Sequence, residues 1–306
     1  MINGKIGIAL GGGAARGWAH IGVLKKLVEA GLSPDIVAGT SIGAVVGGCY
    51  VADKLSELEE FSLSLTRRKV FGLLDFNMAG SGLITGRRLC DKLDAHLSMF
   101  SIEKLERRFT AVATELHTGH EVWLNRGRLV EAMRASYALP GIFNPVHIAN
   151  RWLIDGALVN PIPVSVCRAL GAEIVIAVNL QSDTFGKGAV VPECGTSEHD
   201  EEMVDLPEFA NGNGRSAMHL LHRQFFGFGS SAPGISTVMI EAFGIIQDRV
   251  ARSRLAGDPP DLTISPRLAN FGMFEFHKAG DMIALGEAAA ERELHHILEY
   301  VAHRAA

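Results

Sequence analysis

The sequence predicts an α/β protein in which a parallel β-sheet carries helices on its faces. Two strand–turn–helix units follow one another directly near the start of the chain, and consecutive units of this kind imply parallel strands. Their strands, Lys5–Leu10 and Ile36–Gly39, are short, uninterrupted apolar runs, which is the pattern of strands buried on both faces. A third run, Glu173–Asn179, has the same character.

Each of the first two strands ends at a turn of small residues and is followed by a helix. Gly11–Gly13 interrupt the first run, and apolar residues then recur at helical spacing over 15–30 until Gly31 ends the helix. Thr40-Ser41 form the turn after the second strand, and a helix is predicted over 42–52.

The rest of the chain alternates helices and hairpins, followed by a polar insertion and a helical C-terminal part. Helices are predicted over 55–66, 85–98, 129–139 and 163–170, hairpins over 109–124 and 146–154, and a short strand over 262–264. Residues from about 182 to 236 are rich in Gly, Ser, Pro, Glu and Asp, which predicts a flexible insertion. We therefore expect a single domain over 1–306, with a catalytic core at about 5–180 and a helical part over 237–306.

Composition and charge exclude several classes of protein. The 29 Lys and Arg against 34 Asp and Glu give a net charge of −5 with scattered basic residues, so no nucleic-acid partner is expected. Four widely separated cysteines fit neither a disulfide framework nor a zinc site and favour a cytoplasmic setting. The apolar run 36–52 is too short and too rich in glycine for a membrane span, and the glycine-interrupted run after Lys5 makes a poor signal peptide.

A Gly-Thr-Ser-Ile-Gly sequence at 39–43 lies between the second predicted strand and its helix. In a G-x-S-x-G of this placement, a sharp turn presents the serine hydroxyl at the sheet edge, where larger side chains beside it would clash with backbone. The helix that begins at Ile42 also directs its positive end toward Ser41. This context favours a nucleophilic serine over a helix entry without a chemical role.

The glycines Gly11–Gly13 are expected at the same edge of the sheet, because parallel strands share the edge at which they end. Bare backbone amides at the start of a helix suit an oxyanion hole. Nucleotide binding is the competing interpretation and is weakly supported. Counted from Gly12, the string GGGAARG has Ala14 at the third position of the dinucleotide fingerprint G-x-G-x-x-G, which requires a glycine there, and it lacks the Lys-Ser/Thr of a P-loop.

A nucleophilic serine needs a base, and the residues alone offer two kinds. His219, His222 and His277 follow Asp155 in the order that α/β-hydrolases use, but none of the twelve histidines lies at a predicted strand-end loop with glycine support. Asp155 ends a predicted strand, precedes a glycine and has apolar neighbours. An ordinary turn aspartate has the same position, so the pattern leaves this choice open.

Four sequence blocks stand in order along the chain: GGGAARG at 11–17, GTSIG at 39–43, ASYALPGIF at 135–143 and DGALVNPIP at 155–163. Together they resemble the patatin-like phospholipases, most closely the bacterial branch related to neuropathy target esterase. The resemblance covers the scaffold from residue 5 to about 180. It implies a patatin-like three-layer α/β/α sandwich with a mostly parallel central sheet.

The resemblance also implies a serine–aspartate dyad without histidine. By carry-over, Ser41 is the nucleophile and Asp155 is the base. The oxyanion hole falls on the loop Gly11, Gly12, Gly13 and Ala14, chiefly on the amides of Gly12 and Gly13. The supporting motif residues are Arg16 and Gly17, Gly39 and Gly43, and Gly156 and Ala157. The last motif reads D-G-A where D-G-G is the commoner form, a variant that the bacterial branch tolerates.

The implied chemistry is hydrolysis of carboxylic esters of long acyl chains, with lysophospholipids or phospholipids as leading substrates. A carboxylate of ordinary pKa is a poor base at neutral pH, so the mechanism requires an apolar setting that raises the pKa of Asp155. Neither a metal nor a cofactor is required.

Two other functions remain open, a regulatory or lipid-binding role with low turnover and acyl transfer. The apolar cluster Met218–Phe228 in the insertion is either a lid or membrane-docking element, or packs against the sheet. Peripheral contact with the inner membrane face is thus compatible with the sequence. The motifs select neither headgroup, chain length nor oligomeric state.

Overall fold

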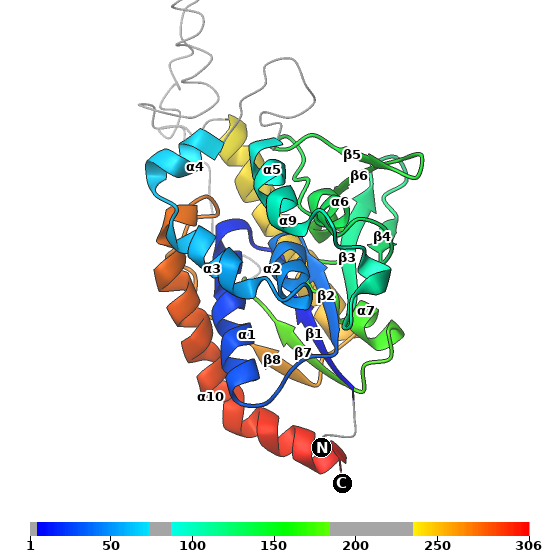
Figure 1. Cartoon of the computed structure of the whole chain (residues 1–306), viewed down its shortest axis with the longest axis vertical. Helices are drawn as coiled ribbons and strands as arrows, with labels where there is room; N and C mark the ends of the chain where they lie inside the picture. The colour runs from blue at the N-terminus through cyan, green and yellow to red at the C-terminus, as the bar shows by residue number, and fades with distance from the viewer. Residues whose placement is uncertain (1–4, 74–86, 184–234, 306) are drawn as a thin grey trace, which may run out of the picture. The chain divides into compact units, whose positions relative to one another are not determined.

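The computed structural model describes residues 5–73, 87–183 and 235–305 (Figure 1). The chain divides into two compact units, Met1–Phe185 with Gln247–Ala306, and Gly186–Ile246. All the strands that the described residues form belong to the first unit. The expected insertion at about 182–236 lies almost wholly outside the described residues, and the cluster Met218–Phe228 lies entirely outside them. The expectation of a single domain therefore stays a prediction.

An eight-stranded mixed sheet forms the centre of the first unit. Hydrogen-bonded pairing links its strands in the sequence β5-β6-β3-β2-β1-β7-β8, in which β6 and β2 pair with different parts of β3, and β4 also pairs with β3. Parallel pairing joins β3, β2, β1, β7 and β8, whereas β4, β6 and β5 are added antiparallel. The strands are β1 (Ile6–Leu10), β2 (Ile36–Thr40), β3 (Arg108–Glu115), β4 (Glu121–Leu124), β5 (Val146–Ile148), β6 (Arg151–Asp155), β7 (Ile174–Val178) and β8 (Leu262–Ile264).

Helices cover both faces of this sheet, which confirms the predicted α/β class. One face packs against α1 (Ala19–Glu29), α2 (Ile42–Val51) and α10 (Ala279–Ala305). The other packs against α7 (Val164–Ala169) and residues 247–257 of α9 (Ile235–Gly257). Alternate strand residues supply the two cores, because neighbouring side chains of a strand point to opposite faces. In β1, Ile8 and Leu10 join the first core and Ala9 joins the second.

Shorter elements complete the unit. They are α3 (Leu55–Leu63), α4 (Arg67–Leu73), α5 (Arg87–Leu97), α6 (Leu129–Ser136) and the 3-10 turns η1 (Ala14–Trp18), η2 (Ile102–Lys104), η3 (Gly156–Leu158) and η4 (Phe276–Lys278). The apolar pattern of the sequence does not predict α4, because two helical turns are too short for a periodicity to be recognised. The helix expected over 129–139 ends at Ser136, and beyond it the carbonyl of Ala138 accepts a hydrogen bond from the amide of Asp155 at 2.9 Å.

The helices α1 and α10 lie side by side and approach at backbone contact (Figure 1). A Cβ atom on Gly22 would overlap the carbonyl oxygen of Ile283, and a Cβ on Gly286 would overlap that of Ala19. This crossing therefore admits no side chain at either glycine, and it fixes α1 and the loop before it.

We expect Gly286→Ala to lower the free energy of unfolding by about 1–3 kcal/mol, because an inserted methyl forces the two helices apart. Denaturant unfolding of purified variants measures it. Gly280→Ala in the same helix is the control, since its Cβ would meet only Leu63 Cδ2, at an ordinary 3.5 Å. Equal stability of both variants and the wild type would show that the crossing is not tightly packed.

Candidate active site

Ser41 lies on a sharp turn between β2 and α2 and is almost fully buried. Its φ of 56° and ψ of −125° are strained for a residue with a side chain. The Ser41 amide donates to Ser136 Oγ at 2.9 Å, and that hydroxyl donates to the carbonyl of Val112 at 2.5 Å. Side chains at Gly39 and Gly43 would overlap backbone atoms, so the turn requires glycine at both positions.

The register of β3 places Asp155 beside this turn. Pairing of β2 with β3 ends at Thr40 opposite Val112, and β6 pairs with the next residue, Ala113 opposite Asp155. Because β4 pairs with 111–114, it occupies the edge of β3 that β2 does not. Since β4 and β6 both pair with Ala113, β6 must share the edge of β2. The two strands therefore run toward each other along one edge of β3, and their ends meet.

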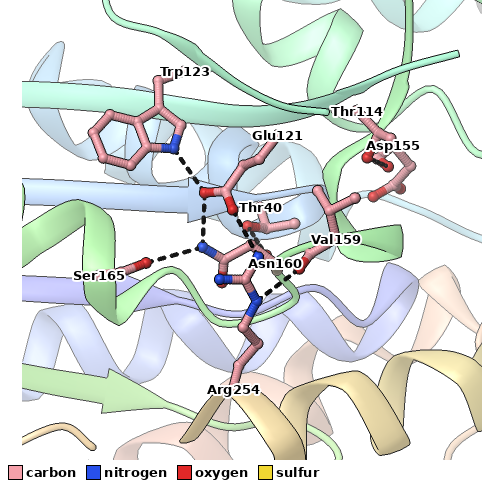
Figure 2. Close-up of polar contacts among 9 residues, drawn as sticks. All are labelled: Thr40, Thr114, Glu121, Trp123, Asp155, Val159, Asn160, Ser165 and Arg254. Atoms are coloured by element: carbon pink, nitrogen blue, oxygen red, sulfur yellow. Dashed lines mark hydrogen bonds and ion pairs between the residues drawn. The ribbon is translucent and has the colours of Figure 1, made fainter. Parts of the chain in front are cut away.

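A short hydrogen bond joins the two ends. Ser41 Oγ donates to Asp155 Oδ2 at 2.6 Å, and the amide of Ala157 donates to the other oxygen, Oδ1, at 2.8 Å. The backbone carbonyl of Asp155 accepts from Thr114 Oγ1 at 2.8 Å (Figure 2). Asp155 is only 1% exposed. Each carboxylate oxygen thus has one donor, and the hydroxyl of Ser41 is directed at the carboxylate.

Burial raises the pKa of Asp155 to about 7, against the opposing effect of the bonds from Ser41 and Ala157. Removal of the carboxylate from water disfavours its charged form, and two donors restore only part of the lost hydration. A carboxyl group of this pKa matches the requirement for a base at neutral pH.

Within the described residues, Asp155 is the one titratable group in hydrogen-bond contact with Ser41 Oγ. His20 is buried, and its Nε2 contacts the carbonyl of Gly11 at 2.8 Å. Burial lowers the pKa of His20 to about 4, so its imidazole is neutral at pH 7. His277 contacts Arg67, and His219 and His222 lie outside the described residues.

The glycine loop lies against the serine. A Cβ on Gly12 would stand 3.5 Å from Ser41 Cβ. The structure narrows the expected set of oxyanion donors, because each amide has a single hydrogen. The amide of Gly11 donates to Val178 O at 3.2 Å and that of Gly12 to Pro161 O at 3.0 Å. The amides of Gly13 and Ala14 donate to no acceptor in the part of the chain that the structure describes.

The loop is held by a segment that the sequence analysis did not single out. Arg16 is buried and its Nε donates to the carbonyl of Phe271 at 2.8 Å. The amide of Ala15 donates to Met273 O at 2.9 Å, and Trp18 Nε1 donates to Phe276 O at 3.2 Å. The acceptors are all backbone carbonyls, which every residue type offers, so the pattern of side chains gives no signal of them.

The remaining motif residues serve close packing. Gly17 lies against the side chain of Ile42, and Gly156 lies against the backbone of Val112. The amide of Ala157 orients the carboxylate of Asp155, as described above. These glycines bring the glycine loop, the serine turn and β3 close together.

Among the helices of the described residues, none has the length and apolar character that crossing a bilayer demands.

Comparison with known proteins identifies relatives along nearly the whole chain. Residues 8–168 match the family model of patatin-like phospholipase. An uncharacterized NTE family protein of Mycobacterium tuberculosis is 33% identical, over 95% of this chain and 91% of that protein. A second uncharacterized NTE family protein of the same species is 29% identical, over 95% of this chain and 46% of that protein.

Two further similarities cover a shorter part of the chain or have lower sequence identity. A patatin-like phospholipase domain-containing protein of Caenorhabditis elegans is 37% identical, over 60% of this chain and 14% of that protein. The crystal structure of VipD from Legionella pneumophila superposes with a TM-score of 0.46 at 12% identity, covering 94% of this chain and 66% of that chain. The family match and the mycobacterial relatives establish that the chain belongs to the patatin-like phospholipase family, among its NTE-related members.

Proposed function

We propose that this chain is a serine hydrolase of lipid esters that works through a dyad of Ser41 and Asp155. The observation that carries the proposal is the 2.6 Å hydrogen bond from Ser41 Oγ to a buried carboxylate. The family supports a lipid acyl hydrolase, and the strained turn supports the choice of Ser41 as nucleophile.

The reaction begins when Ser41 Oγ attacks the ester carbonyl and its proton passes to Asp155 Oδ2. The bond from the amide of Ala157 to Oδ1 keeps Oδ2 directed at the serine. Asp155 then returns the proton to the departing alcohol, which leaves an acyl group on Ser41. A water molecule then attacks the acyl carbonyl and gives its proton to Asp155. Asp155 passes a proton to Ser41 Oγ as the fatty acid leaves, which restores the starting state.

Charge that develops on the carbonyl oxygen requires donors that are not already engaged. In the glycine loop these are the amides of Gly13 and Ala14, and we assign the oxyanion hole to them. The first turn of α2 adds its positive end beside Ser41. Arg16 supports this hole by tying the loop to Phe271.

Lipid esters of long acyl chains are the proposed substrates, with lysophospholipids and phospholipids first. The family match supports this choice of substrate class. Contact with a membrane surface follows from the substrate and is part of the same proposal.

Ser41→Ala and Asp155→Asn should each lower kcat/KM on a p-nitrophenyl ester and on a lysophospholipid by ~10³-fold or more, since each removes a group that acts in every turnover. Steady-state hydrolysis measures this loss. Ser62→Ala is the matched control, because Ser62 is also buried and donates to a backbone carbonyl in α3, away from the site. Near-full activity of Asp155→Asn would exclude the aspartate as base.

The pH dependence of kcat/KM should rise with pH and level off above about 7, because only the ionised carboxylate accepts the proton of Ser41. A pH–rate profile from pH 5 to 9 on a short ester measures the midpoint. A midpoint near 4, the ordinary value for a carboxyl group, would contradict the burial of the base.

Asp155→Asn should stabilise the protein at pH 8. The folded-state pKa is raised, so the carboxyl ionises more readily in the unfolded chain, and wild-type stability falls as pH rises from about 4 to about 7. The amide variant does not ionise and escapes that loss.

Thermal unfolding at pH 5 and pH 8 tests this linkage. The gain in Tm of the variant should grow with pH, by roughly 2–4 °C for each kcal/mol recovered. If the difference in Tm between variant and wild type were the same at pH 5 and pH 8, the pKa of Asp155 would be the same in the folded and unfolded states.

A further inference from the structure

The segment Asp155–Pro161 contacts all three parts of the proposed site. Its first residue accepts the hydrogen bond of Ser41 Oγ. Near its end, the carbonyl of Asn160 accepts from Thr40 Oγ1 at 2.8 Å, next to the serine. The carbonyl of Pro161 accepts from the amide of Gly12 at 3.0 Å. A displacement of this segment would therefore move the base, the nucleophile turn and the oxyanion loop relative to one another.

Three side chains hold this segment in place, and we call them the Glu121 cluster: Glu121, Asn160 and Arg254. Figure 2 shows their arrangement. Asn160, only 1% exposed, donates from Nδ2 to Glu121 Oε1 at 2.9 Å and to Ser165 Oγ at 3.3 Å. Trp123 Nε1 donates to the same Glu121 oxygen at 2.7 Å.

Arg254 closes the Glu121 cluster from α9. Its Nη2 pairs with Glu121 Oε2 at 3.0 Å, and its Nε donates to the carbonyl of Val159 at 3.0 Å. The planar guanidinium makes both bonds from fixed positions, which a lysine ammonium does not reproduce. Its charge also balances that of Glu121, which is largely removed from water.

We infer that Asn160, Glu121 and Arg254 are positioning residues, which align Asp155 with Ser41 and the oxyanion loop without touching substrate. The inference rests on the proposed function. Its physical basis is the sensitivity of proton transfer and nucleophilic attack to distance, since a displacement of about 1 Å costs ~10²-fold in rate. A purely structural cluster would instead lower stability and leave turnover of the folded enzyme unchanged.

The first test exchanges donor and acceptor. Asn160→Asp replaces the donating amide by a carboxylate that faces Glu121, so the segment is pushed away and kcat on a short p-nitrophenyl ester should fall ~10²-fold. KM should change little. Adding Glu121→Gln restores one hydrogen bond in the opposite direction, and this double variant should recover at least about tenfold in kcat.

The second test uses two arginines of the same helix. Arg254→Gln should lower kcat about tenfold. This loss is smaller than that of Asn160→Asp, because the side-chain amide of Asn160 keeps its hydrogen bond to Glu121. Arg252→Gln is the matched control, because Arg252 pairs with Asp248 at 2.8 Å in α9 and is similarly exposed, 47% against 39%. Arg252→Gln should leave kcat unchanged. Both positions are near the surface, so both variants are expected to fold.

The outcomes also separate this inference from the proposed function. A wild type that is inert on every ester overturns the proposed function. An active wild type with inactive Ser41→Ala, but with Asn160→Asp and Arg254→Gln as active as Arg252→Gln, overturns the positioning role alone. Equal losses in both arginine variants, or no rescue in the double variant, overturn it as well.

Discussion

The hydrogen bond between Ser41 and Asp155 joins two groups that are both removed from water. A buried carboxylate is costly unless donors replace its hydration, and among the described residues Asp155 has two donors, the hydroxyl of Ser41 and the amide of Ala157. The deficit appears as a pKa raised to about 7. The same shortage of donors that makes the folded state less stable at high pH makes the carboxylate basic. The basicity proposed for Asp155 and the loss of stability at high pH therefore have the same cause, the incomplete replacement of its hydration.

Unusual backbone conformations occur at Ser41 and in the glycine loop that lies against it. Ser41 has φ of 56° and Ala14 has φ of 48°, and neither is a glycine. Such conformations persist only where surrounding contacts fix them. Ser136 and Val112 fix the first, and the carbonyls of 271–276 hold the residues that follow the second. His20 contributes as a neutral imidazole, since its bond to the Gly11 carbonyl holds the start of the loop.

The sequence predicts the local parts of this molecule well and the long-range parts poorly. Strands β1, β2 and β7 and helices α1 and α2 follow from apolar runs and from the turn residues between them, which are local signals. These local signals leave open whether an aspartate or a histidine is the base for the serine. The choice depends on the register of β6 along β3, and no pattern within either strand encodes that register. The anchoring of Arg16 to Phe271 joins residues 255 apart through a backbone carbonyl, which has no sequence signature.

Strand β3 sets the spacing between the strand ends that carry the two proposed catalytic residues. Thr40, the residue before Ser41, and Asp155 face successive residues of β3, Val112 and Ala113, so the ends of β2 and β6 are one strand step apart along β3, about 3.3 Å. Strand side chains alternate between faces, so a slip of one residue in β6 would also turn the carboxylate to the opposite side of the sheet. A single-residue insertion or deletion within 151–155 would therefore move Asp155 out of place. The tip of the β5–β6 hairpin, Ala149 and Asn150, lies at the other end of β6. The hairpin tips and loops are therefore where the chain tolerates a change in length, whereas β3 and β6 tolerate only substitutions that keep this register.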